Sequence, residues 1–182
     1  MINGQTVLAV IPARGGSKRV PRKNLREFRG KTLLAWAFEQ ARGSNYIDLI
    51  ACSTDDSEIW SYAFSMGCPI KRPQELATDT ASSEDVIRHA LSEVPGPYEW
   101  VVLLQPTSPL RTAEDIDACI ERAQMGDGCI SINRSTGHQN GAVYVAKAEW
   151  IAKHDFTHQG LMKYSMDADR SLDIDTEEDF NK

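Results

Sequence analysis

The amino-acid sequence predicts an α/β fold in which helices cover both faces of a mostly parallel sheet. Short apolar, β-branched runs alternate along the chain with longer segments of helical apolar spacing. Hydrophobic residues make up 41% of the chain and charged residues 25%, which are ordinary values for a globular protein. Because 182 residues is the usual length of one domain, we expect residues 1–182 to form a single domain.

The predicted strands and helices follow one another in regular order. Apolar runs predict buried strands at residues 7–11, 47–52, 101–104, 129–132 and 142–145. The spacing between these runs predicts helices at residues 33–42, 57–66, 84–91 and 113–123. Sheets of this kind bind ligands at the carboxyl ends of their strands. We therefore expect the functional site after Ile11, Ser53 and Leu104, and around Asp173.

Charge and cysteine content argue against several classes of function. The net charge of −6 is unfavourable for general nucleic-acid binding, which relies on many cations. The four cysteines form no Cys-x-x-Cys pair, so neither a zinc ribbon nor a redox motif is indicated. The first residues lack a basic leader, and no apolar run approaches the length of a membrane span. We expect a cytoplasmic protein without nucleic-acid or membrane partners.

Positive charge is concentrated in and after residues 13–24, which follow the first predicted strand and are named the basic loop here. Eight cationic side chains lie between Arg14 and Lys31, opposed only by Glu27. Gly15 and Gly16 let backbone N–H groups approach an anion. The loop is neither a Walker A motif nor a dinucleotide-binding motif. We expect it to bind a small polyanion, with a solvated basic turn as the alternative.

The basic loop also carries a family resemblance. From Ile11 to Leu25 the sequence reads Ile-Pro-Ala-Arg-Gly-Gly-Ser-Lys-Arg-Val-Pro-Arg-Lys-Asn-Leu, which resembles the signature of the acylneuraminate cytidylyltransferases. These enzymes make CMP-sialic acids and the related pseudaminic and legionaminic acid nucleotides. The resemblance continues in order through residues 51–56, 72–83, 104–111, 140–144 and 172–179.

This resemblance implies a fold of the nucleotide-diphospho-sugar transferase (Rossmann-like) type. It also implies transfer of CMP from CTP to the anomeric hydroxyl of a sialic acid-like α-keto acid sugar, with release of pyrophosphate. Position-by-position matching places Arg14, Lys18 and Lys23 at the phosphates, with Arg14 and Lys23 assisting the chemistry. The other implied nucleotide-binding residues are Ala13, Gly15, Gly16, Ser17, Asn24, Arg72 and Ser83. For Ser83 an equal alternative is the N-cap of the helix predicted at residues 84–91.

The resemblance assigns two further residues to the sugar, Gln105 and Thr107. They follow a continuous apolar strand, so their side chains emerge at the ligand edge of the sheet. The alternative is a turn shaped by Pro106 and Pro109, in which Thr107 satisfies backbone groups. A turn of this kind requires neither Gln105 nor Arg111, and this favours a functional role.

Asp173 and Asp175 are the expected metal ligands. If the segment is extended, Ile174 between them places both carboxylates on one face. Paired carboxylates beside substrate phosphates suit Mg²⁺, the implied cofactor. Asp175 also fits a helix N-cap with Glu178, in a pattern like a capping box. The resemblance favours the metal, and it implies CTP and an acidic sugar as partners.

One region departs from the family pattern. The family carries a long excursion before its Asn-Gly-Ala segment, with a sugar-binding lysine, arginines and much of the dimer contact. Here only residues 133–139 separate Ile132 from Asn140, and His138 stands where the family has an arginine. The sequence also stops at Lys182, where the family is expected to continue its final helix. A homodimer would lack its usual contact segment, and two alternatives stay open: a CTP-binding module without sugar activation, and transfer to a smaller acceptor.

Overall fold

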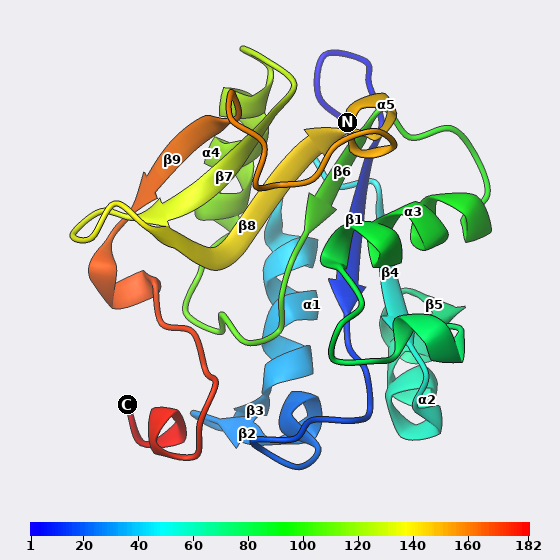
Figure 1. Ribbon diagram of the computed structural model, residues 1–182, viewed down its shortest axis with the longest axis vertical. Helices are drawn as coiled ribbons and strands as arrows, with labels where there is room; N and C mark the ends of the chain where they lie inside the picture. The colour runs from blue at the N-terminus through cyan, green and yellow to red at the C-terminus, as the bar shows by residue number, and fades with distance from the viewer.

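A seven-stranded sheet organises the computed structural model, which describes residues 1–182 (Figure 1). In spatial order its strands are β5 (Cys68–Lys71), β4 (Leu49–Thr54), β1 (Val7–Pro12), β6 (Trp100–Leu103), β8 (Gln139–Lys147), β7 (Gly128–Asn133) and β9 (Met162–Met166). All neighbouring strands are parallel except at β8, which runs against both β6 and β7. The predicted mostly parallel sheet is therefore confirmed.

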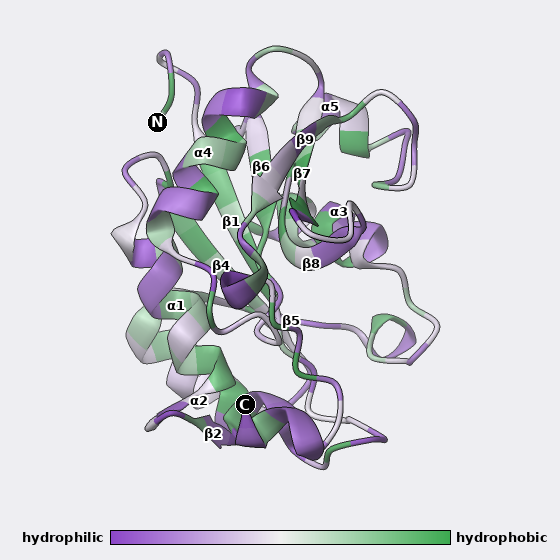
Figure 2. Cartoon of the chain, turned by 90° about the vertical axis from the view of Figure 1, so that its left-hand side faces the viewer, coloured by the Kyte–Doolittle hydropathy of each residue, from purple (hydrophilic) through white to green (hydrophobic).

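Helices cover both faces of the sheet, as predicted. They are α1 (Leu33–Gly43), α2 (Ser57–Met66), α3 (Ser83–Glu93), α4 (Ala113–Ala123) and α5 (Ala148–Ile151). Because side chains alternate along a strand, Val7, Ala9 and Ile11 pack with α1, α2 and α4 on one face. Leu8 and Val10 pack with α3 and α5 on the other. Figure 2 shows the apolar residues concentrated on the strands and on the helix sides that face them.

Two strands of this sheet were not predicted from the sequence, and both lie at its edges. A separate two-stranded sheet of β2 (Glu27–Phe28) and β3 (Lys31–Thr32) was not predicted either. β5 contains Pro69, which cannot donate a backbone hydrogen bond and is tolerated at an edge. β9 has the sequence MKYSM, which lacks the β-branched residues that indicate strands. An edge strand buries fewer side chains than a central one, so its sequence carries a weaker signal. No helix combines the length and apolar character needed to cross a membrane.

The start of α3 differs from the prediction by one residue. The Oγ atom of Ser82 accepts a hydrogen bond of 3.0 Å from the backbone N–H of Asp85, so Ser82 is the N-cap. Ser83 is the first residue of the helix, and the expectation that it caps α3 is wrong. Its side chain is consequently not required for capping.

The C-terminal segment returns along the carboxyl edge of the sheet to the basic loop (Figure 1). Arg170 fastens it to α4 through two bonds of 3.0 Å to the Asp115 carboxylate. Ile174 is fully buried, and its backbone N–H donates to the Thr107 carbonyl at 2.8 Å. The aspartates on either side of Ile174 are thereby placed between the basic loop and the segment that follows β6.

Candidate nucleotide and acceptor site

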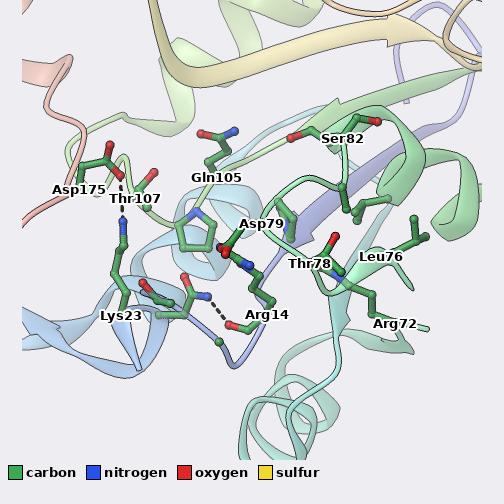
Figure 3. A pocket seen from close by; sticks show the side chains of 18 of the residues that line it. Arg14, Lys23, Arg72, Leu76, Thr78, Asp79, Ser82, Gln105, Thr107 and Asp175 are labelled. Atoms are coloured by element: carbon green, nitrogen blue, oxygen red, sulfur yellow. Dashed lines mark hydrogen bonds and ion pairs between the residues drawn. The ribbon is translucent and has the colours of Figure 1, made fainter. Parts of the chain in front are cut away.

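A polar cavity of about 420 Å³ opens at the carboxyl ends of β1 and β6 (Figure 3). The strand order reverses beside β1, because the chain runs outward through β4 and β5 and then returns to β6 on the other side. Ligands of open α/β sheets bind at such a reversal. The lining residues are Pro12, Arg14, Gly16, Ser17, Lys23, Asn24, Arg72, Leu76, Thr78, Asp79, Ala81, Ser82, Ser83, Val86, Gln105, Pro106, Thr107, Asp173 and Asp175.

Most of the expected site residues line this cavity, and three do not. Ala13 is fully buried in the apolar core beneath it. Gly15 donates its backbone N–H to Asp55 Oδ1 at 3.0 Å, and a Cβ atom there would lie 2.7 Å from Asp56 Oδ2. Lys18 extends into solvent at the rim. The residues that do line the cavity come from segments that are far apart in the sequence.

Two cations of the basic loop share one carboxylate. Arg14 Nη2 pairs with Asp79 Oδ1, and Lys18 Nζ pairs with Asp79 Oδ2. Figure 3 shows Asp79 beside Arg14 within the cavity. Hydrogen bonds from Lys18 and Arg14 lower the pKa of Asp79. Asp79 could not be singled out from the sequence, because a loop carboxylate 65 positions from Arg14 gives no spacing signal.

A second carboxylate, Asp175, pairs with two more cations of the basic loop. Lys23 Nζ lies 3.0 Å from Asp175 Oδ1 and 3.1 Å from the Ile174 carbonyl oxygen. Arg19 Nη1 lies 2.8 Å from Asp175 Oδ2. The Lys23 side chain is only 12% exposed, so it is held in place, whereas Arg19 is largely exposed. Carboxylates therefore pair with the cationic side chains that the resemblance assigns to phosphate binding.

The backbone of the basic loop explains how Lys23 is aimed. Arg22 adopts the left-handed conformation, with φ 54°, and the chain then turns into the 3-10 helix Lys23–Leu25. Asn24 Nδ2 donates to the Arg14 carbonyl at 2.9 Å, which ties the two ends of the loop together. Lys23 is thus directed toward the C-terminal segment while Arg14 faces the 72–83 segment.

Arg72 forms the floor of the cavity from the end of β5. Its Nε donates to Ser53 Oγ at 3.1 Å and its Nη2 donates to the Ser53 carbonyl at 2.8 Å. The side chain is buried, and this burial lowers its pKa. A buried guanidinium bound only to neutral oxygens keeps its positive charge available to an anion in the cavity.

Asp173 and Asp175 both line the cavity, but the segment is not a regular strand. Desolvation by the surrounding protein raises the pKa of Asp173. The negative charge of Asp175 raises it further, whereas a hydrogen bond from Thr107 lowers it. The capping prediction for Asp175 is wrong, because Asp179 Oδ2 instead accepts the backbone N–H groups of Asp175 and Thr176. The carboxylate of Asp175 is therefore directed at the cavity and not at a helix end.

This carboxylate pair fits a magnesium ion. Mg²⁺ uses one or two protein carboxylates and completes its coordination with water and substrate phosphates. Asp173 and Asp175 supply that number of carboxylates at one cavity, and no cluster of three or more ligand side chains is present. A metal that depends on a complete protein cage is not suited to this site.

Gln105 and Thr107 lie where β6 ends, and Gln105 also lines a neighbouring cavity of about 470 Å³. The Ser108 backbone N–H donates to the Gln105 carbonyl at 3.3 Å, so the predicted turn is also present. The other residues that line this second cavity are Asn133, Thr136, Gln139, Asn140, Gly141, Tyr144, Ser171 and Asp173. None of them is cationic, and His138 does not line the cavity.

The sheet order and the polar cavity at its carboxyl edge define an α/β protein of the nucleotide-diphospho-sugar transferase type. The sequence model of the family described as Cytidylyltransferase matches residues 8–171. The chain therefore belongs to this cytidylyltransferase family.

Two curated relatives show where in the family the chain lies. It is 33% identical over 211 residues to N-acylneuraminate cytidylyltransferase of Escherichia coli O18:K1:H7, covering 96% of this chain and 50% of the relative. It is 38% identical over 120 residues to pseudaminic acid cytidylyltransferase of Campylobacter jejuni, covering 63% of this chain and 52% of the relative. The chain thus spans about half the length of these relatives, and the resemblance to acylneuraminate cytidylyltransferases is confirmed.

The alignment with the Escherichia coli relative extends over 211 positions, more than the 182 residues of this chain. That relative therefore contains residues, within the matched region, that this chain lacks. This finding agrees with the short connection seen at residues 133–139.

Solved structures confirm the predicted fold type. CMP:2-keto-3-deoxy-manno-octonic acid synthetase complexed with CTP has a TM-score of 0.72 at 15% identity, covering 94% of this chain and 93% of that chain. Rv0371c of Mycobacterium tuberculosis H37Rv, in complex with manganese, has a TM-score of 0.70 at 17% identity, covering 97% and 96%.

Proposed function

We propose that this chain transfers CMP from CTP to the anomeric hydroxyl of a sialic acid-like α-keto acid sugar and releases pyrophosphate. One observation carries the proposal: a single cavity joins the cations Arg14 and Lys23 to Gln105 and to the two aspartates. Its support comes from relatives named for N-acylneuraminate and pseudaminic acid, and from a structural neighbour complexed with CTP. We place the enzyme in the cytoplasm and give it no nucleic-acid partner, the latter because of its negative net charge.

In this proposal the triphosphate displaces the carboxylates from the basic loop. Arg14 and Lys23 donate to phosphate oxygens and stabilise the negative charge that develops as the acceptor oxygen attacks the α-phosphorus. Lys18 adds positive charge at the rim, and Gly16 and Ser17 lie along the phosphates. Asn24, Arg72 and Ser83 face the rest of the nucleotide.

The acceptor lies on the opposite side of the cavity. Gln105 and Thr107 hold its hydroxyl groups so that the anomeric oxygen meets the α-phosphorus in line with the departing pyrophosphate. Asp173 and Asp175 would hold Mg²⁺, which neutralises charge on the triphosphate. The manganese complex of a structural neighbour supports use of a divalent cation, and magnesium as the particular metal is part of this proposal.

The test is a pyrophosphate-release assay with CTP and Mg²⁺ across a panel of keto-acid sugars. We expect release with at least one nine-carbon α-keto acid sugar, and none when ATP or GTP replaces CTP. Calorimetry should show CTP binding more tightly than ATP or GTP. Equal affinity for all triphosphates would leave a generic anion site and overturn the cytidylyl assignment.

A second candidate is a CTP-binding module that has lost sugar activation. The short connection at residues 133–139 favours it, because that connection replaces a segment with acceptor-binding cations in the family. Preferential CTP binding without pyrophosphate release from any acceptor would support this candidate. Release with only a smaller acid would instead indicate a changed acceptor.

A further inference from the structure

The turn that follows β6 contains a buried arginine with few partners. Arg111 is 2% exposed, and its Nε and Nη2 atoms have no hydrogen-bond partner. Nη1 donates to the Gln105 carbonyl at 2.8 Å and to the Ala142 carbonyl at 2.7 Å. Burial lowers the pKa of Arg111 to about 9, and the Asp115 charge opposes this only in part. The guanidinium is thus bound to two backbone carbonyls and to no carboxylate.

These two carbonyls lie on segments that line the second cavity, through Gln105 on one and Gly141, the neighbour of Ala142, on the other. The hydrogen-bonded ladder between β6 and β8 ends at the pair Leu103 and Tyr144. Beyond that pair the strands separate, and Arg111 then bridges them from Gln105 to Ala142. The Arg111 side chain therefore links β8 to the segment after β6 where backbone hydrogen bonds between them have ended.

The Gln105 side chain lies beside this bridge. Gly141 has φ +74°, a conformation that favours glycine, and a Cβ atom there would lie 3.1 Å from Gln105 Oε1. The amide of Gln105 therefore rests against the backbone of β8, immediately beside the carbonyl that Arg111 holds. Movement of either wall would displace this amide.

Packing alone does not account for an arginine at this place. A buried charge without a carboxylate partner costs stability, and an apolar side chain of similar volume would fill the same space at lower cost. We propose that Arg111 is a positioning residue that holds Gln105 against Gly141 and so fixes the acceptor-facing wall of the site. This inference rests on the proposed function, in which Gln105 contacts the acceptor.

Arg88 provides a control because it also joins two backbone carbonyls, away from both cavities, although it is partly exposed and pairs with Asp85 as well. Its Nε donates to the Ile151 carbonyl at 2.9 Å and its Nη2 donates to the His154 carbonyl at 3.0 Å. The comparison of Arg111→Met with Arg88→Met separates positioning of the acceptor from the general loss of an arginine that joins two backbone carbonyls. Arg111→Lys tests rescue, since one ammonium group can donate to both carbonyls.

We expect Arg111→Met to reduce kcat/KM for the acceptor by about a hundredfold, the effect of a misplacement near 1 Å. CTP affinity should stay within about threefold of the parent. Arg111→Lys should recover part of the loss, and Arg88→Met should leave acceptor kinetics within about threefold. Unchanged acceptor kinetics in a folded Arg111→Met, or an equal loss of CTP affinity, would overturn the inference.

A second measurement needs no turnover: hydrogen exchange at the backbone amides of Gln105 and Thr107 and of residues 141–143. Exchange in both segments should rise about tenfold or more in Arg111→Met but not in Arg88→Met. If the parent releases no pyrophosphate, the proposed function fails, and faster exchange in both segments still supports the bridge. Unchanged exchange overturns the bridge, whatever the activity. If Arg111→Met does not fold, Arg111→Lys and the parent are compared in the same way.

Discussion

The basic loop and the acceptor side of the cavity hold their positive charge in opposite ways. In the loop Arg14, Lys18 and Lys23 pair with carboxylates, and the Lys18 side chain is 84% exposed. On the acceptor side Arg111 is 2% exposed and binds backbone carbonyls. Exposed ion pairs contribute about 0–1 kcal/mol each and exchange readily, whereas buried bonds are costly to break. The basic loop is therefore suited to exchange its partners, and the acceptor side to stay fixed.

The largest expected effect tests the boundary between the two sides. Asp173→Asn keeps the shape of the side chain and removes its charge, so Mg²⁺-dependent turnover should fall by about a thousandfold. The free energy of unfolding should change by no more than about 1 kcal/mol, because the side chain is at the surface of the cavity. Metal titration of pyrophosphate release measures the effect.

Asp175→Asn should fail in the same assay, and Asp127→Asn, an exposed carboxylate paired with Lys147 away from the cavity, should not. Full metal dependence in both cavity variants would show that the aspartate pair is structural. The two aspartates between the nucleotide side and the acceptor side would then not act through a metal.

The next effect tests whether phosphate replaces carboxylate on the nucleotide side. Lys23→Ala removes a charged contact and should weaken CTP binding or turnover by about tenfold to a thousandfold, with an unchanged circular dichroism spectrum. Arg29→Ala is the control, because Arg29 lies in the same stretch and donates instead to the Lys182 carbonyl. Parent-like CTP affinity in Lys23→Ala would place the phosphates elsewhere.

A change of opposite sign sharpens the comparison. Asp79 competes with phosphate for Arg14 and Lys18, so Asp79→Asn should tighten CTP binding about two- to tenfold, the scale of two exposed ion pairs. Glu75→Gln removes charge from the same segment without an ion pair to the basic loop and serves as the control. Weaker CTP binding in Asp79→Asn would contradict a competing role.

The same carboxylate predicts a pH dependence. Because Arg14 and Lys18 lower the pKa of Asp79, the group stays ionised throughout the neutral range. The affinity difference between parent and Asp79→Asn should therefore be constant at neutral pH. It should be lost only as the pH falls through the lowered pKa, below the ordinary value of 3.8.

The smallest effect separates two neighbouring serines. Ser82→Ala removes the N-cap of α3 and should lower the free energy of unfolding by about 1 kcal/mol. Ser83→Ala should leave stability unchanged and weaken CTP binding severalfold, by about 1 kcal/mol for one hydrogen bond. Thermal unfolding and calorimetry of both variants measure the two quantities. If Ser83→Ala affects only stability, its side chain does not contact the nucleotide.

The sequence predicted the central sheet well because its strands are continuous apolar runs between amphipathic helices. It missed β5 and β9 because edge strands carry little of that pattern. The cavity residues that it identified belong to long ordered motifs, in which identity and spacing are both informative. Asp79 was not identified as a partner of the site, and Arg111 was noted only as a residue that a turn does not require, since the contacts of both exist only in the folded chain. For the same reason the cap considered at Ser83 lies at Ser82, and the cap considered at Asp175 is not formed.

The pairing of the basic loop also bears on how quickly a ligand arrives. A cluster of free cations would attract a triphosphate from beyond a Debye length and accelerate the encounter. Here Asp79 and Asp175 cancel much of that field before any ligand is present, and the protein as a whole carries a net charge of −6. Association is then governed less by long-range attraction than by how often the two carboxylates release the loop. The association rate constant for the triphosphate is then limited by the rate at which these ion pairs open.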